Sequence, residues 1–309
     1  MAIFNIINEY ILSYVLRFLM SIFSNNFAVA IFVFTLVINL IMIPLTVKSQ
    51  KSSMQQMKLK PKLDAIKEKY GDDKQKYNTA MQELYTKEKV SMSGGCLPMI
   101  VRLVFLMSIY YLVLGPITYL TTVDATTVQE LAGALGITVK NNIRLDLDVI
   151  AKITAPDFVA PAGFETQASE ILSAVKNINF NFFGIDLTSK PHFALNLSKV
   201  ELNWIIPFLA FGTAMLGSIL SIRTQKKSNP GGPSMTGMML LMPLMSLFIA
   251  FNAPCGLGFY WACSSLISAL IQEGVQYFYG PGKMIARERA KSILNRYDIE
   301  KKSIGSIKD

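Results

Sequence analysis

The chain has 309 residues, of which 51% are hydrophobic and only 17% are charged. Soluble domains usually carry about 25% charged residues, so this composition argues against a purely water-soluble protein. The single histidine excludes the common zinc sites and most enzymes that rely on histidine, and the three cysteines do not predict a disulfide framework. No secretory signal peptide is evident, because the first twenty residues lack a basic region and a small-residue cleavage site.

Apolar residues concentrate in five long blocks of the chain. A helix needs about 20 mostly apolar residues to cross the roughly 30 Å hydrocarbon core of a bilayer. Each block reaches about this length, the fourth only when it extends into the turn at residues 252–256. The sequence therefore predicts an all-α polytopic membrane protein with five transmembrane helices. These helices are expected at residues 23–47, 97–120, 203–222, 235–253 and 257–279.

Residues 1–22 are predicted to form an amphipathic helix that lies at the membrane interface. Large apolar residues recur there at three- and four-residue steps, whereas Asn5, Asn8, Glu9 and Arg17 interrupt them. A sixth, weakly apolar span is the alternative.

The charged residues predict the orientation of the spans. Segments 48–89, 223–234 and 283–309 hold 22 of the 30 Lys and Arg residues, while residues 121–203 hold six bases and nine acids. Loops rich in Lys and Arg stay on the cytoplasmic side. We therefore expect the N-terminus outside and the C-terminus in the cytoplasm. The net charge of +9 then needs no nucleic acid, although the basic cytoplasmic tail 280–309 could touch a ribosome.

Two connections are long enough to fold outside the membrane. Residues 48–92 predict a cytoplasmic helical hairpin, because Gly71 and the two following acids supply a helix stop and then an N-cap. A solvated spacer and a docking or gating element both fit this hairpin. Residues 121–202 predict a small, loosely attached extracytoplasmic cap with helices near 127–135 and 165–175 and no catalytic constellation.

Arg102 is the one conspicuous charge inside a predicted span. A charge at mid-bilayer costs at least about 2.5 kcal/mol, so such residues point to function. At about 1.5 Å per residue, Arg102 lies about 7 to 8 Å from the cytoplasmic end of its span, and Asn39 about 12 Å. This depth fits either a hydrated pocket open to the cytoplasm or an arginine that snorkels to the headgroups. Further polar residues at membrane depth are Thr35, Thr213, Ser218, Ser264, Ser265, Ser268 and Gln272.

An ordered series of motifs runs through the predicted spans. They are Ile-Met-Ile-Pro-Leu-Thr at 41–46, Met-Lys-Leu-Lys-Pro-Lys at 57–62, Lys-Tyr-Gly-Asp-Asp-Lys-Gln-Lys at 69–76, Leu-Tyr at 84–85, Gly-Gly-Cys-Leu-Pro at 94–98, Phe-Phe-Gly-Ile-Asp-Leu at 182–187, Pro254 with Gly256, and Phe-Tyr-Trp at 259–261. Together they closely resemble the YidC membrane protein insertases of the YidC/Oxa/Alb superfamily. The resemblance covers the N-terminal helix and all five spans, while residues 121–179 lie outside it.

The resemblance implies an insertase that passes transmembrane segments from a cytoplasm-facing hydrophilic groove into lipid. In that family an arginine of the first span makes the groove positive. Here Asn39 takes its place, and Arg102 takes the place of a groove glutamine in the second span, which favours the pocket over snorkelling. Trp261 matches a groove aromatic, with an interfacial belt tryptophan as the alternative. The implied groove comprises Arg102, Asn39, Thr35, Trp261, Ser264, Ser265, Ser268 and Gln272.

An apolar client segment is then expected to slide along spans two and five before it enters lipid. That step is downhill by about 0.3 to 0.6 kcal/mol for each Leu, Ile, Phe or Val. No ATP-binding Gly-x-x-x-x-Gly-Lys-Ser/Thr motif is present, and neither a catalytic residue nor a metal or cofactor is expected. The expected slide comprises Leu103, Leu106, Met107, Tyr110, Leu266 and Leu270.

The implied partners are nascent membrane proteins and the lipid bilayer. The ribosome, the signal recognition particle receptor and the Sec translocon are further partners, and the protein is expected to act as a monomer in a bacterial plasma membrane. A small-solute transporter or channel that uses Arg102 as an anion site is the alternative. The odd number of spans, the absence of repeats and the Lys-rich hairpin argue against it. An intramembrane hydrolase lacks a Ser/His or paired-Asp arrangement in the spans.

Overall fold

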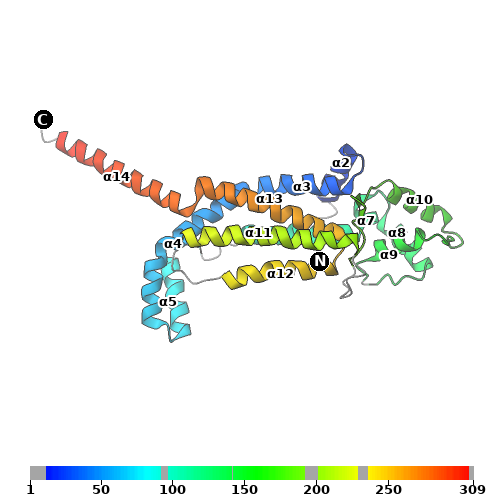
Figure 1. Cartoon of the computed structure of the whole chain (residues 1–309), viewed down its shortest axis with the longest axis horizontal. Coiled ribbons are helices and arrows are strands. Elements are labelled where there is room, and N and C mark those ends of the chain that lie inside the picture. The colour runs from blue at the N-terminus through cyan, green and yellow to red at the C-terminus, as the bar shows by residue number, and fades with distance from the viewer. Residues whose placement is uncertain (1–11, 92–96, 141, 192–200, 229–235, 306–309) are drawn as a thin grey trace. The chain divides into compact units, whose positions relative to one another are not determined.

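The computed structural model groups the chain into two compact units (Figure 1). The first unit comprises Met1–Leu40, Val101–Ile219 and Met235–Ala269, and the second comprises Ile41–Ile100, Leu220–Ser234 and Leu270–Asp309. The first half of the predicted interfacial helix, the Gly-Gly-Cys motif and part of the loop 223–234 lie outside the described residues. The described residues are 12–91, 97–140, 142–191, 201–228 and 236–305.

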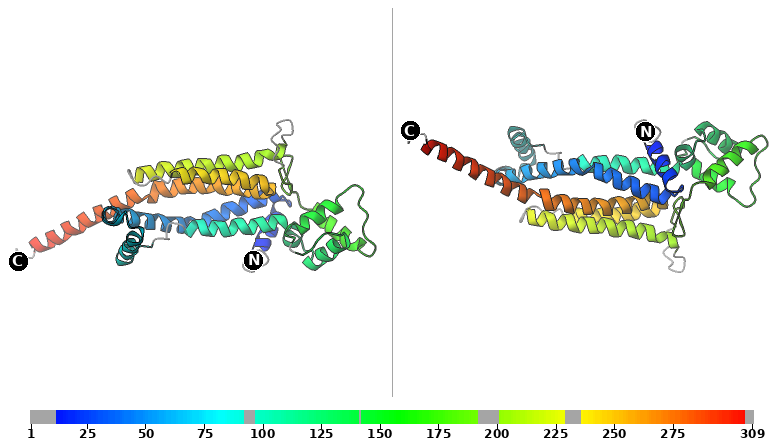
Figure 2. Two further views of the ribbon diagram at one scale, coloured as in Figure 1. Left: turned by 90° about the horizontal axis from the view of Figure 1, so that it is seen from below. Right: turned by 90° about the horizontal axis from the view of Figure 1, so that it is seen from above.

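The first unit contains parts of five apolar helices, which run side by side within it as a bundle (Figures 1 and 2). Helices α3, α11 and α13 begin in the first unit and end in the second, whereas α6 begins in the second and ends in the first. The short helix α2 (Ser13–Ile22) lies at one end of the bundle. The five helices are α3 (Phe27–Ile41), α6 (Leu97–Leu114), α11 (Ile205–Ser228), α12 (Thr236–Asn252) and α13 (Cys255–Tyr279).

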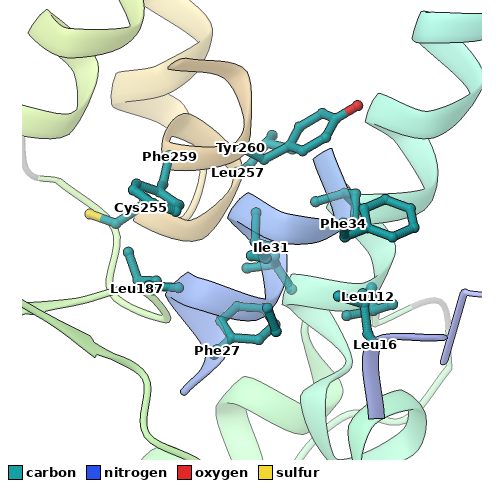
Figure 3. Packing of buried hydrophobic residues seen from close by; sticks show 14 of the residues in the cluster. Leu16, Phe27, Ile31, Phe34, Leu112, Leu187, Cys255, Leu257, Phe259 and Tyr260 are labelled. Carbon is teal, nitrogen blue, oxygen red and sulfur yellow. The ribbon is translucent and has the colours of Figure 1, made fainter. Parts of the chain in front are cut away.

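The main core of the first unit lies where α2, α3, α6 and α13 meet (Figure 3). Phe27 and Ile31 of α3 are fully buried there, together with Leu16 of α2 and Leu112 of α6. Burying one such side chain from water stabilises a fold by about 1.5 to 3 kcal/mol. Any part of the core that lies within a bilayer depends instead on close packing, because lipid is as apolar as these side chains.

Two helical stretches of the described chain, Leu202–Arg223 and Cys255–Tyr297, are long and apolar enough to cross a membrane. A third arises if α3 and α4 (Ile43–Tyr70) together form one bent span. The described helices therefore support an all-helical protein with two or three candidate spans, and the predicted total of five remains a prediction. Shorter apolar helices cover Ser13–Ile22, Ile100–Leu114 and Met239–Asn252.

The single helix predicted over residues 97–120 is wrong. Helix α6 ends at Leu114, and a separate helix α7 covers Pro116–Leu120. Proline lacks a backbone N–H and disfavours helical geometry at the preceding residue, here Gly115. The break lets α7 leave the bundle and join the segment that follows it, residues 121–202.

The predicted cap is a three-helix cluster of α8 (Ala125–Ala134), α9 (Leu145–Ile153) and α10 (Glu165–Lys176). The two helices expected from the sequence are confirmed as α8 and α10, whereas α9 was not predicted. The expected loose attachment is wrong, because Ile117 of α7 is fully buried in the apolar core of the cluster. The peptide N–H of Thr118 in α7 also donates to Oδ2 of Asp146 in α9 at 2.7 Å.

A two-stranded antiparallel hairpin follows the cap. It consists of β1 (Asn181–Phe182) and β2 (Ile185–Asp186). The chain after β2 contacts the start of α13, since the N–H of Gly256 donates to the carbonyl oxygen of Leu187 at 2.7 Å. The hairpin is therefore fixed to the end of the helical bundle at which α13 begins.

The second unit is a helical hairpin with a long C-terminal helix against it. Its elements are α4, α5 (Lys74–Lys87) and α14 (Pro281–Gly305), and α4 contacts both of the others. The predicted N-cap is confirmed, because the side chain of Asp73 accepts hydrogen bonds from the N–H groups of Gln75 and Lys76. The ion pairs Lys62–Glu88 and Lys58–Glu288 join α4 to the end of the hairpin and to α14.

Candidate functional site

A polar contact joins α3 to α13 inside the first unit. The hydroxyl of Ser268 donates to Oδ1 of Asn39 at 2.7 Å, and both side chains are buried. The Asn39 amide nitrogen donates to the carbonyl oxygen of Thr35 at 2.8 Å. Asn39 and Ser268, two residues of the predicted groove, are thus hydrogen-bonded to each other. A third, Thr35, accepts a hydrogen bond from Asn39 through its backbone carbonyl.

The hydroxyl of Thr35 forms a hydrogen bond within its own helix. Its Oγ1 donates to the carbonyl oxygen of Ile31 at 2.6 Å, and the side chain is buried. Because a buried hydroxyl without a partner is costly, this local bond explains how a threonine is accommodated here. Thr35 therefore supports Asn39 through its backbone rather than through its side chain.

Arg102 lies exposed on α6 and interacts electrostatically with Tyr260 of α13. The hydroxyls of Tyr260 and Ser264, one helical turn apart, form a hydrogen bond. Tyr260 is buried and belongs to the same main core as Phe34 of α3 (Figure 3). The accessible charge and a hydroxyl pair on the neighbouring helix thus form a second polar contact within the same unit.

Tyr260 was not among the residues predicted for the groove. It was noted only as part of the aromatic motif at 259–261. The missed signal is the spacing of Tyr260, Ser264 and Ser268, since residues four apart lie on one face of a helix. A stripe at this spacing predicts that all three side chains face the same neighbours.

The remaining predicted groove residues are placed separately. Trp261 is half-buried and packs against an alanine cluster contributed by α11, α12 and α13. Ser265 is half-buried on α13, and Gln272 is half-buried on the part of α13 that belongs to the second unit. The alanines around Trp261 are Ala210, Ala250 and Ala262.

The predicted slide residues differ in exposure. Leu103 and Leu266 are 55% and 39% exposed, as expected of side chains that face lipid or an apolar client. Leu106 and Tyr110 instead pack against the main core, and Met107 is half-buried. Leu270 is exposed on the second-unit part of α13. The slide role stays a prediction for all six residues.

This arrangement offers a fixed positive charge on α6 and hydroxyl groups on α13, two helices that are otherwise largely apolar. A guanidinium attracts carboxylates strongly where water is scarce, because the effective dielectric constant is lower there. Within the described residues, no group of three or more His, Cys, Asp or Glu side chains is arranged to hold a metal ion. The chemistry available at Arg102 is attraction of anionic groups by a permanent charge.

Comparison with known proteins gives a family match over most of the chain. The family model described as the 60Kd inner membrane protein matches residues 18–280. A membrane protein insertase YidC of Brucella melitensis is 27% identical over 253 residues, which cover 82% of this chain and 33% of the relative. A protein of the same name from Oleidesulfovibrio alaskensis is 28% identical over 246 residues, covering 80% of this chain and 34% of the relative.

A shorter stretch matches at higher identity. The membrane protein insertase YidC of Pseudoalteromonas atlantica is 44% identical over 109 residues, which cover 35% of this chain and 20% of the relative. The chain spans about a third of the length of the Brucella and Oleidesulfovibrio relatives. The similarity therefore extends to one part of each relative.

Proposed function

The chain belongs to the 60Kd inner membrane protein (YidC/Oxa) family, and from this premise we propose that it inserts transmembrane segments of other proteins into the lipid bilayer. This membership confirms the resemblance predicted from the sequence motifs. The proposed activity is a transfer between environments and forms or breaks no covalent bond. Its clients are nascent membrane proteins, and the ribosome, the signal recognition particle receptor and the Sec translocon are proposed as further partners.

The proposed topology has five spans, the N-terminus outside and the C-terminus in the cytoplasm. Two or three candidate spans and the shorter apolar helices α6 and α12 support this number. The asymmetry of Lys and Arg residues supports the orientation. In this topology the cap of α8 to α10 lies outside, and the hairpin of α4 and α5 lies in the cytoplasm.

The observation that carries the proposed mechanism is Arg102 on α6, beside the bonded pair Tyr260 and Ser264 on α13. Placing a charge within a bilayer costs free energy, so an arginine at this depth indicates a functional role. We propose that Arg102, Asn39 and the hydroxyls of α13 line a hydrophilic groove. The groove lowers the cost of moving a client's short polar tail part of the way across, and Arg102 attracts acidic residues of that tail.

The apolar part of the client then leaves sideways into lipid. Leu103 and Leu266 are exposed on the helices that carry the polar residues, so an apolar segment can contact them without unfolding the core. Insertion of the segment into lipid is downhill for each large apolar residue, which supplies the driving force without ATP. The polar and apolar steps therefore use different side chains of the same two helices.

The proposed role of the Arg102 charge in insertion can be tested by removing that charge. Arg102→Ala should lower insertion of a client with an acidic translocated tail roughly tenfold, the effect of losing about 1.4 kcal/mol of charge attraction. Arg102→Lys should retain most activity because it keeps the charge. The measurement is protease protection of the tail after insertion into vesicles that contain the purified protein.

A matched client supplies the control. When its tail carries Asn and Gln in place of Asp and Glu, Arg102→Ala should insert it almost as well as the wild type does. Equal losses with both tails would show that Arg102 supports the structure and not the charge attraction. The double variant Asn39→Arg with Arg102→Gln should restore insertion of the acidic client, because it returns the charge to the first span beside Ser268.

A further inference from the structure

Phe183 at the tip of the β1–β2 hairpin has an unusual combination of backbone and side-chain features. Its φ is 49°, and that of the following Gly184 is 87°. Two-residue hairpin turns with positive φ at both positions favour Asn-Gly, and a bulky residue there is strained. The phenylalanine side chain is nevertheless 87% exposed. Its ring contacts the neighbouring Phe182 edge-on, with centroids 4.8 Å apart, but this contact leaves most of the side chain exposed. Neither the turn nor the core therefore accounts fully for an aromatic residue at this position, which points to a role outside the fold.

The hairpin is held firmly at the end of the bundle where α11 and α13 begin. Phe182, the neighbour of Phe183, packs against Phe259 of α13 with ring centroids 4.6 Å apart. A Cβ atom on Gly184 would come within 3.3 Å of Leu202, which begins the short helix η3 (Leu202–Trp204) that leads into α11. The tip therefore has a fixed position beside the first residue of a candidate span.

An apolar surface continues from the hairpin tip along this span. The candidate span runs over Leu202–Arg223, and Leu202, Ile205 and Phe208 at its start are each about half exposed. Phe183 adds an aromatic ring at the level where the span begins, because it precedes the glycine that contacts Leu202. Trp and Tyr are enriched at this depth of a membrane, where the hydrocarbon meets the headgroups. Phenylalanine occurs there on the lipid-facing side of interfacial segments.

Exposed polar groups beside Phe183 favour the membrane interface over the hydrocarbon as its surroundings. The side chain of Asn181 accepts a hydrogen bond from the N–H of Gly184 at 2.8 Å. The carboxylate of Asp186 accepts one from the N–H of Thr188 at 2.8 Å, and both acceptor residues are exposed. Exposed polar groups of this kind stay in the headgroup region, while an adjacent ring can reach the acyl chains.

We propose that Phe183 inserts into the outer headgroup and acyl-chain boundary of the bilayer and anchors the hairpin there. Because the hairpin contacts Phe259 and Leu202, the anchor also fixes the depth at which α13 and α11 begin. The binding partner is the lipid surface itself. This inference rests on the proposed span at Leu202–Arg223 and goes beyond the insertase function.

Tryptophan fluorescence in reconstituted vesicles tests the anchor. The native Trp204 and Trp261 are replaced by Phe, and one tryptophan is introduced as Phe183→Trp. The vesicles are phosphatidylcholine with bromine on the acyl chains at either a shallow or a deep carbon. We expect blue-shifted emission and strong quenching, with the shallow bromines more effective than the deep ones.

Two matched variants separate failure of the anchor from failure of the span. Phe208→Trp places the reporter in the candidate span, where the deep bromines should quench it most. Val159→Trp places it in the exposed loop between α9 and α10, where its emission should be water-like and free of bromine quenching. If the Phe183→Trp variant emits like the Val159→Trp variant while Phe208→Trp is quenched, the anchor is overturned and the span stands. If neither Phe183→Trp nor Phe208→Trp is quenched, the span and the anchor both fail.

Discussion

The two units differ in the interactions that stabilise each of them internally. In the first unit, large apolar side chains from α2, α3, α6 and α13 are buried in one cluster (Figure 3). In the described part of the second unit, the buried apolar residues are Met54, Leu59 and Val275. There the ion pairs Lys58–Glu288 and Lys62–Glu88 join partly exposed side chains from different elements.

The second unit should open locally at a lower free-energy cost than the first. Regions with few buried apolar contacts open locally at lower free energy than a packed core. Exposed ion pairs contribute only about 0 to 1 kcal/mol each, so they do not replace a core. We therefore expect the second unit to rearrange during function, while the first unit holds Arg102 and its polar neighbours in place.

The largest expected effect contrasts two glycines of α13. Gly258 lies in the first unit, where an added Cβ would come within 2.7 Å of the buried side chain of Ile206. Gly274 lies in the second unit, and an added Cβ there meets nothing within 4 Å. Gly258→Ala should cost about 1 to 3 kcal/mol of stability through overpacking. Gly274→Ala should be neutral or stabilising by up to about 1 kcal/mol, because alanine favours the helix.

Equilibrium unfolding of both variants in detergent measures this contrast. The double variant Gly258→Ala with Ile206→Ala should be less destabilised than the sum of the two single changes, since the new methyl group occupies space that Ile206 leaves. Equal stability of Gly258→Ala and Gly274→Ala would contradict the idea that only the first unit is tightly packed.

A smaller effect is expected where the cap meets α7. Burial raises the pKa of the Asp146 carboxyl, and hydrogen bonds from Thr118 partly offset this rise. With a pKa higher in the folded than in the unfolded state, this group contributes stability that is complete below about pH 4 and is lost as the pH rises through the raised pKa. Acidification should therefore strengthen the attachment of the cap.

Two substitutions at Asp146 test this sign. Asp146→Asn keeps an acceptor for the Thr118 N–H, so it should retain the attachment and remove its pH dependence. Asp146→Ala should cost about 1 to 2 kcal/mol, because it leaves the N–H and hydroxyl of Thr118 without this partner. Hydrogen exchange of residues 117–121 between pH 4 and pH 7 is the measurement. Wild-type protection that rises with pH would reverse the argument.

Elements with strong local signals could be predicted from the sequence. Gly71 and Asp73 specify the turn between α4 and α5, and the structure confirms the N-cap at Asp73. Helix α9 was missed because Leu145, Leu147 and Val149 alternate as in a strand, and its N-cap residue makes no side-chain capping bond. Its helical state depends on packing in the core of the cap, which a local pattern does not contain.

The sequence could predict which residues make up the candidate site, but not which of them contact one another. Depth in the spans selected Arg102, Asn39 and Ser268 from the sequence. The bond between Asn39 and Ser268 joins residues 229 positions apart, so it follows only from the packing of α3 on α13. Tyr260 was overlooked because an aromatic residue in an apolar span resembles ordinary packing, and its link to Arg102 becomes visible only when α6 lies beside α13.

The smallest expected effect concerns the ion pair that joins α4 to α14. Lys58→Glu should weaken protection of α14 from proteolysis by the equivalent of at most about 1 kcal/mol, because the pair with Glu288 is exposed. High salt should produce a similar weakening in the wild type through screening. The exchanged pair, Lys58→Glu with Glu288→Lys, should restore protection, whereas Lys58→Glu with Glu300→Lys should not. Restoration by both double variants would mean that the net charge of α14, and not the pair, holds the second unit together.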